Sequence, residues 1–127
     1  MSHLGLVALV VDDYDDAIAF YVDVLGFEVR EDRDEGHKRW VVVAPPGAET
    51  GILLARAADD RQRSRIGDQT GGRVGWFLVT DDFERDHARF VARGVRFTEE
   101  PRHEDYGSVA VFEDLYGNRW DLLQLRS

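Results

Sequence analysis

The sequence predicts an α+β fold of two tandem βαβββ modules, which form a curved, mostly antiparallel eight-stranded sheet with the helices on its outer face. An apolar strand followed by a helix and three further strands occurs twice along the chain. Landmarks of the two copies lie at one offset, since Val79 follows Val11 by 68 residues and Gly94 follows Gly26 by 68 residues. One module cannot bury its sheet face alone, whereas two modules leave a concave face for a ligand.

The first module spans about residues 1–56 and begins with an apolar strand at residues 4–11. Asp15 and Asp16 lie in the first turn of the helix that follows, where carboxylates favour the positive end of the helix dipole. Gly26 is the expected helix end. The core-facing residues of this helix share helical spacing and are Ala17, Ile18, Phe20, Tyr21, Val24 and Leu25.

Three short strands complete the first module. They are predicted at residues 27–30, 39–43 and 52–55, with a polar turn at residues 32–36. Residues 57–73 are polar with little periodicity, so we expect an irregular connector with room for one helical turn.

The second module, residues 74–127, repeats this order. A strand at residues 74–79 precedes a helix whose core stripe contains Phe83, His87 and Phe90. Strands follow at residues 95–98, 108–112 and 120–125, with a loop at residues 101–107. The whole chain, residues 1–127, is thus expected to form a single domain of two repeats.

Composition limits the function classes. The chain has 127 residues, no cysteine and a net charge of −9, so disulfides, thiolate nucleophiles and cysteine metal sites are excluded. The negative charge argues against nucleic acid and mildly favours a cationic ligand. No apolar run has the roughly 20 residues that a membrane helix needs, and the first residues lack signal-peptide features. We therefore expect a cytoplasmic protein without membrane or nucleic-acid partners.

The final strand carries the most informative side chain. Asp114, Gly117 and Asn118 are turn residues, and the strand after them is mainly apolar. Because side chains alternate along a strand, Asp121 lies on the face opposite Trp120. This carboxylate either acts as a general base, binds a cationic ligand, or pairs structurally with an arginine.

Two segments give the chain a family resemblance. Residues 11–21 with Leu25-Gly26-Phe27, and the segment from Asp114 to Asp121, resemble the vicinal oxygen chelate superfamily. That group includes glyoxalases, extradiol dioxygenases, fosfomycin-modifying enzymes and bleomycin-resistance proteins. The resemblance covers essentially the whole chain and implies two βαβββ modules and a homodimer. It leaves the reaction open, because one fold hosts many functions.

The resemblance also implies four inward metal ligands, from the first and last strands of each module. Matched residue by residue, these positions fall on Leu6, Leu53, Val74 or Gly75, and Asp121. A divalent ion needs several nitrogen or oxygen donors, and only Asp121 supplies one. We therefore expect no metal cofactor at the usual site.

Other candidate residues have competing structural interpretations. His103 lies on a predicted loop and is a candidate for acid–base work, the alternative being a solvated loop histidine. Trp40 and Trp76 either reach the concave face, where they would stack on a ligand, or belong to the core. The candidate catalytic residues are Asp121 and His103. The candidate ligand-binding residues are Leu6, Trp40, Leu53, Trp76, Arg102 and Tyr106.

These observations predict a small-molecule-binding protein of the glyoxalase/bleomycin-resistance type, which sequesters or transforms an organic compound without the usual metal. The alternative is a metal-dependent lyase, isomerase or dioxygenase with a non-standard site, which would recruit Asp121 with His37, His103 or residues of a partner chain. A third hypothesis is a protein that keeps the pocket without chemistry and acts through its interfaces. Whether the protein is an enzyme stays open at this point.

Overall fold

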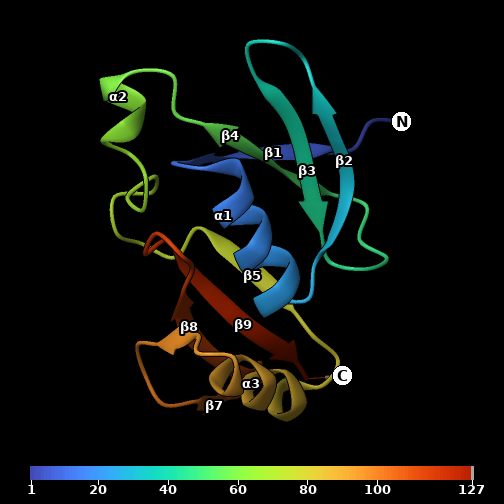
Figure 1. The fold of residues 1–127 in the computed structure, drawn as a ribbon. Coiled ribbons are helices and arrows are strands. Elements are labelled where there is room, and N and C mark those ends of the chain that lie inside the picture. Colours follow the sequence, from blue (N-terminus) through green and yellow to red (C-terminus); the bar gives the residue numbers. More distant parts are fainter. Residues whose placement is uncertain (127) are drawn as a thin grey trace. The chain divides into compact units, whose positions relative to one another are not determined.

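Two β-sheets organise the chain in a computed structural model, which describes residues 1–126. The chain divides into two compact units, residues 1–69 and residues 70–127, and each unit contains one sheet and its helices (Figure 1). No helix within the described residues is long and apolar enough to cross a membrane.

The sheet of the first unit has the strand order β1-β4-β3-β2. β1 pairs parallel with β4, and the other neighbours are antiparallel. The strands are β1 (Leu6–Val11), β2 (Glu28–Asp34), β3 (Arg39–Ala44) and β4 (Gly51–Arg56). Beyond β4, the short helix α2 (Asp60–Arg63) lies in the predicted connector, which confirms the expected helical turn.

The first helix is partly α-helical and partly π-helical. α1 (Tyr14–Ile18) is capped by Asp13, whose Oδ2 accepts the Asp16 N–H at 2.8 Å. The chain continues directly into the π-helix η1 (Ala19–Val24), where the Leu25 N–H donates to the Phe20 carbonyl at 3.1 Å. This wider hydrogen-bond spacing corrects the regular helix that the apolar stripe predicted.

The second unit repeats the strand order of the first, as β5-β9-β8-β6, and again pairs its first and last strands in parallel. An additional strand, β7, pairs with β8. The elements are β5 (Trp76–Val79), α3 (Phe83–Ala92), β6 (Arg96–Phe97), β7 (Arg102–Glu104), β8 (Gly107–Glu113) and β9 (Arg119–Leu125). Two βαβββ arrangements in one chain confirm the predicted α+β fold class.

Two predicted loops are shorter than expected. β2 continues to Asp34, so the predicted turn at residues 32–36 is partly strand. β7 lies inside the predicted loop at residues 101–107. Both are polar strands at the outer side of a sheet, where charged side chains reach solvent, and their sequences therefore lack apolar alternation.

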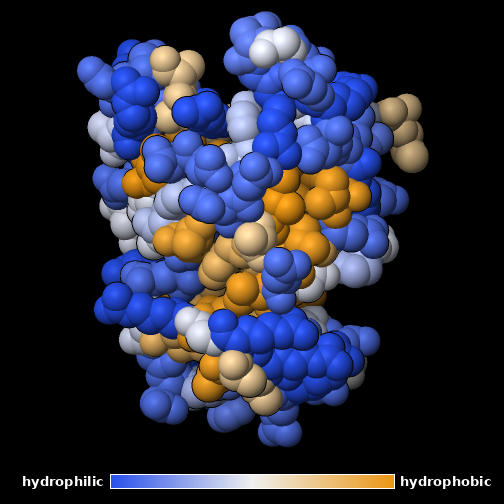
Figure 2. Space-filling model, viewed as in Figure 1, coloured by the Kyte–Doolittle hydropathy of each residue, from blue (hydrophilic) through white to orange (hydrophobic). Residues whose placement is uncertain are grey.

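Each sheet buries the face that its helix covers. In the first unit, Leu9, Leu54 and Val41 are fully buried beneath α1 and η1. In the second, Phe83 and Phe90 of α3 are buried, and the outer side of α3 is largely hydrophilic (Figure 2). The residues that share this buried face of the second sheet are Ala110, Phe112, Trp120 and Leu122.

The turn before β9 is held by Asp114. Its buried Oδ1 accepts the N–H groups of Tyr116 and Asn118 at 3.0 and 2.9 Å, and its Oδ2 accepts the Asn118 side-chain amide at 2.9 Å. These bonds replace water around a buried carboxylate. The predicted turn is thereby confirmed, and its polar residues have a structural role.

Gly107 is expected to be the glycine most sensitive to substitution. Its φ is +149°, and an added Cβ would overlap the Gln124 carbonyl. Gly107→Ala should therefore lower the free energy of unfolding by roughly 2 kcal/mol or more in urea denaturation. Gly117→Ala is the matched control, because Gly117 also has positive φ (+96°) but open space around its Cβ position. Equal losses in the two variants would contradict the predicted overlap.

Candidate functional site

In the first unit, the predicted positions Leu6 and Leu53 lie on the sheet face turned away from the helix. Leu6, Ala8 and Leu53 lie on this face, because their neighbours Leu9 and Leu54 are buried on the other. Ala8 is the register partner of Leu53 across the parallel pair. The two predicted positions Leu6 and Leu53 therefore share one open surface.

A pocket of about 390 Å³ opens where β3 and β4 separate. The two strands pair only through Val41–Leu54, Val42–Leu53 and Val43–Ile52, although both strands extend further. The pocket lies at these unpaired ends. Its walls are Tyr14, His37, Lys38, Arg39, Trp40, Leu53, Leu54, Ala55, Arg56, Ala57 and Ala58.

Trp40 supplies the largest aromatic wall of this pocket. Its indole Nε1–H donates to Glu31 Oε2 at 3.1 Å, and the Arg33 guanidinium lies 6.0 Å from the ring centroid. These contacts hold the indole at the end of β3 that does not pair with β4. The structure thus brings together two residues that the sequence proposed for ligand binding, Trp40 and Leu53.

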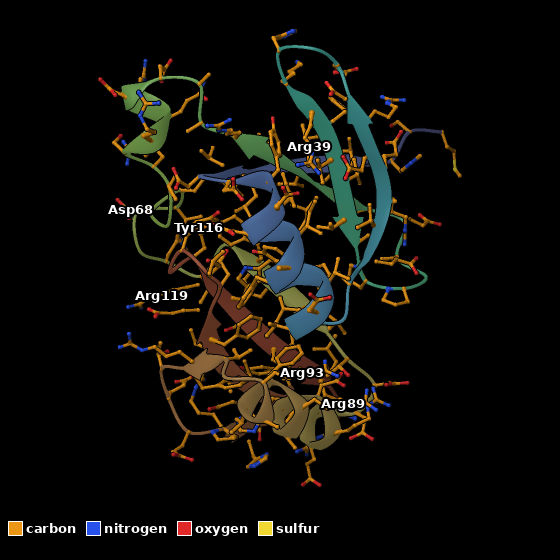
Figure 3. The ribbon with its side chains drawn as sticks, in the orientation of Figure 1. Arg39, Asp68, Arg89, Arg93, Tyr116 and Arg119 are labelled. Carbon is orange, nitrogen blue, oxygen red and sulfur yellow. The ribbon has the colours of Figure 1, made fainter. Side chains whose placement is uncertain are left out.

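Arg39 is a further wall of the pocket, and its side chain is labelled in Figure 3. Its guanidinium donates to Asp32 at 2.8 Å and to Asp15 at 2.9 Å, and lies 5.2 Å from the Tyr14 ring centroid. The hydrogen bonds to Asp32 and then to Asp15 raise the pKa of Arg39. The Arg39 N–H also donates to the Tyr14 hydroxyl at 3.3 Å. Sequence reasoning missed Tyr14 and Arg39, because their partners are far apart along the chain.

In the second unit, Asp121 lies in the middle of the open sheet face. Its register partners are Phe77 on β5 and Val111 on β8, so an apolar side chain lies on each side. Phe77 is 59% exposed. Asp121 Oδ1 is buried and has no hydrogen-bond partner within residues 1–126. A buried carboxylate oxygen without a partner is costly and therefore marks a candidate binding position.

The electrostatics of Asp121 follow from its neighbours. Burial raises the pKa of this carboxyl, the charge of Arg102 lowers it, and the charge of Glu99 raises it. Arg102 donates to both Glu99 oxygens at 3.1 Å, and Glu99 Oε1 accepts the Val111 N–H at 3.2 Å. Hydrogen bonding to Glu99, and more weakly to Tyr106, raises the pKa of Arg102. The charges of Arg102 and Glu99 thus act on Asp121, whereas Tyr106 acts on Arg102.

Trp76 and His103 do not share the face of Asp121. Trp76 stacks on Trp120 at 5.8 Å between centroids, on the face that α3 covers. His103 is paired with Ser108, and its Nδ1 lies 2.9 Å from Ser108 Oγ. Ser108 alternates with Val109 and Val111 along β8, so His103 lies on the face opposite Asp121. Of the two interpretations of Trp76, the structure therefore has it on the face that α3 covers, and it separates the two candidate catalytic residues.

The four positions that the family resemblance assigns to a metal all lie on open faces. Gly75 precedes Trp76 and so shares the face of Phe77 and Asp121, which settles the choice between Val74 and Gly75. Leu6, Leu53 and Gly75 have no donor atoms in their side chains. Within residues 1–126, no three His, Asp or Glu side chains converge as metal ligands. The donor set at these positions does not fit a divalent ion.

Comparisons with known proteins agree with this architecture. The family model "Glyoxalase/Bleomycin resistance protein/Dioxygenase superfamily" matches residues 3–122. An uncharacterised protein of Shewanella frigidimarina (strain NCIMB 400) is 57% identical over 122 residues, which cover 94% of this chain and 90% of that protein.

Two solved structures from Streptomyces sp. CB03234 are also similar, each at 34% identity. TnmS3, an antibiotic binding protein, matches with a TM-score of 0.82 over 99% of this chain and 98% of its own. A glyoxalase/bleomycin resistance protein matches with a TM-score of 0.77 over 96% of this chain and 100% of its own.

Asp121→Asn is expected to stabilise the protein at neutral pH. Because burial raises the folded-state pKa above the ordinary 3.8, the ionised carboxylate costs stability above that range. The gain should be largest at neutral pH and should shrink as the pH falls toward 3.8, as the carboxyl becomes protonated in the folded and the unfolded state.

Urea denaturation of both proteins between pH 4 and pH 8 measures this difference. Asp114→Asn is the control, because the Asp114 carboxylate accepts three hydrogen bonds and its loss should destabilise. A loss of stability in Asp121→Asn that grows as the pH rises from 4 to 8 would show that the ionised carboxylate has a stabilising partner.

Proposed function

The chain belongs to the Glyoxalase/Bleomycin resistance protein/Dioxygenase superfamily, and we propose that it binds an organic small molecule in the Trp40 pocket without the help of a metal. We define the Trp40 pocket as the cavity of about 390 Å³ at the separated ends of β3 and β4. Its volume lies within the roughly 300–1,000 Å³ of ligand-binding cavities.

The main support for this proposal is the combination of apolar and aromatic residues that line the Trp40 pocket. Leu53, Ala55 and Ala57 form an apolar side, and the rings of Trp40 and Tyr14 provide flat surfaces. Such walls suit an aromatic compound, since ring stacking adds to the burial of apolar area. The Trp40 indole is already held by Glu31, so little ordering is needed when a ligand binds.

The similarity to solved structures supports a binding role. TnmS3, 34% identical over nearly the whole chain, is an antibiotic binding protein. Sequestration of a toxic aromatic compound would need affinity and no chemistry. The proposed function is therefore capture of such a compound.

A metal-dependent lyase, isomerase or dioxygenase is less well supported. A metal site built on Asp121 needs further side chains as metal ligands, and His103 lies on the opposite face of the second sheet. Metal-free acid–base chemistry by His103 and Asp121 acting as a pair meets the same obstacle. The homodimer expected from the family resemblance stays a prediction, which sedimentation equilibrium would check.

Ligand binding should depend on Trp40. In titrations of purified protein with a panel of two- and three-ring aromatic compounds, tryptophan fluorescence should be quenched. Trp40→Leu should weaken binding about tenfold or more, because it removes the largest wall of the pocket. Leu115→Ala is a control that removes an exposed apolar side chain outside the pocket. Binding that survives Trp40→Leu would place the ligand elsewhere.

Chelation should leave binding unchanged. Prolonged dialysis against EDTA is expected to alter neither the thermal midpoint nor the affinity for the same compound, because the four family positions supply one donor side chain. Elemental analysis before and after dialysis provides the check. A near-stoichiometric metal whose removal abolishes binding would contradict the proposal and favour the metal-dependent alternative.

A further inference from the structure

We propose that the Trp40 pocket selects an aromatic anion, a flat ring system bearing a carboxylate or a similar acidic group. This inference rests on the proposed binding function and specifies its ligand class. An anionic ligand is the opposite of what the net charge of the chain suggests, since a net charge of −9 favours a cation.

The pocket is lined by basic groups within an acidic protein. The chain has 25 aspartates and glutamates against 16 lysines and arginines. The walls nevertheless contain Lys38, Arg39, Arg56 and His37, and no aspartate or glutamate. The formal charge of the lining residues is therefore positive, opposite in sign to the charge of the whole chain.

Arg39 does not supply the free positive charge. Its guanidinium is held by Asp15 and Asp32 at 2.9 and 2.8 Å, so two carboxylates already balance it. This arrangement makes Arg39 a wall of the pocket rather than a site for a ligand anion.

Lys38 and Arg56 are the cations available to a ligand. Neither side chain forms an ion pair with any residue in the part of the chain that the structure describes. Lys38 immediately precedes β3, and Arg56 is the last residue of β4. The two cations thus lie at the strand ends whose separation opens the pocket.

The expected mode of binding follows from this geometry. The ring lies against Trp40 and the apolar residues Leu53 and Ala55, and the acidic group accepts hydrogen bonds from Lys38 and Arg56. Charge-assisted hydrogen bonds are about twice as strong as neutral ones. The nearby carboxylates of Asp15 and Asp32 are held by Arg39, and Glu31 accepts the Trp40 indole N–H. Carboxylates farther away interfere little, because salt screens charges beyond roughly 8–10 Å.

Three probes of one shape test the inference by isothermal titration calorimetry at pH 7.5 and low salt. They are 2-naphthoate, neutral 2-naphthamide and the 2-naphthylmethylammonium cation. The naphthoate should bind at least about tenfold more tightly than the amide, and the cation most weakly. Added salt should weaken naphthoate binding while leaving amide binding unchanged.

Variants assign this selectivity to the two cations. In the double variant Lys38→Gln, Arg56→Gln, the ratio of naphthoate to amide affinity should fall to about one, with amide affinity kept. The control Arg56→Gln, Arg61→Gln removes the same total charge but leaves Lys38, because Arg61 of α2 lies outside the pocket. It should lose only part of the selectivity.

Each outcome separates this inference from the proposed function. Preference for naphthoate that depends on Lys38 and Arg56 supports both the anion selectivity and the proposed small-molecule binding. Equal binding of the three probes, or preference for the cation, overturns the anion selectivity and leaves small-molecule binding intact. Failure of every probe and of the wider aromatic panel to bind overturns both.

Discussion

Parallel pairing of the first strand with the last is the constraint on which each unit depends. β1 pairs with β4, and β5 pairs with β9, so in each sheet the edge strand and its inner neighbour run in the same direction. Once the helix between them covers one face, alternation along the strands assigns every other residue to the opposite face. Leu54 faces the helix and Leu53 the opposite side, and Leu122 and Asp121 divide in the same way in the second unit.

This alternation determines what the open faces can do. The positions that would hold a metal in the family are occupied by Leu6, Leu53 and Gly75, with Asp121 as a single acid. Leucine at such a position enlarges an apolar surface, which suits capture of an organic molecule. The pocket arises from a separate feature, the early end of the β3–β4 ladder, which leaves Trp40 and Arg56 beside an opening that paired strands would close.

Local patterns in the sequence predict much of this structure. Aspartates at helix starts, glycines at helix ends and the Asp114 turn act through neighbours in the chain, so their positions are readable. The open-face placement of Asp121 follows from the alternation of Trp120 and Leu122.

Other features depend on distant partners or lack alternation. Residues 74–79 are almost uniformly apolar, so their sequence does not reveal that Trp76 faces the core and Phe77 the open side. β7 owes its strand conformation to β8, and Arg39 owes its position to Asp15 and Asp32. The basic lining of the pocket depends on distant partners in the same way, since Lys38 and Arg56 line one pocket only after β3 and β4 have paired.

Metal-free capture in the Trp40 pocket is tested most directly by amide chemical-shift mapping of the protein with 2-naphthoate in the presence of EDTA. The expected result is a set of saturable shifts at the Trp40 indole N–H and the amides of residues 53–58, without any added ion. Shifts that appear only after a divalent metal is supplied, and that centre on Asp121, would contradict it.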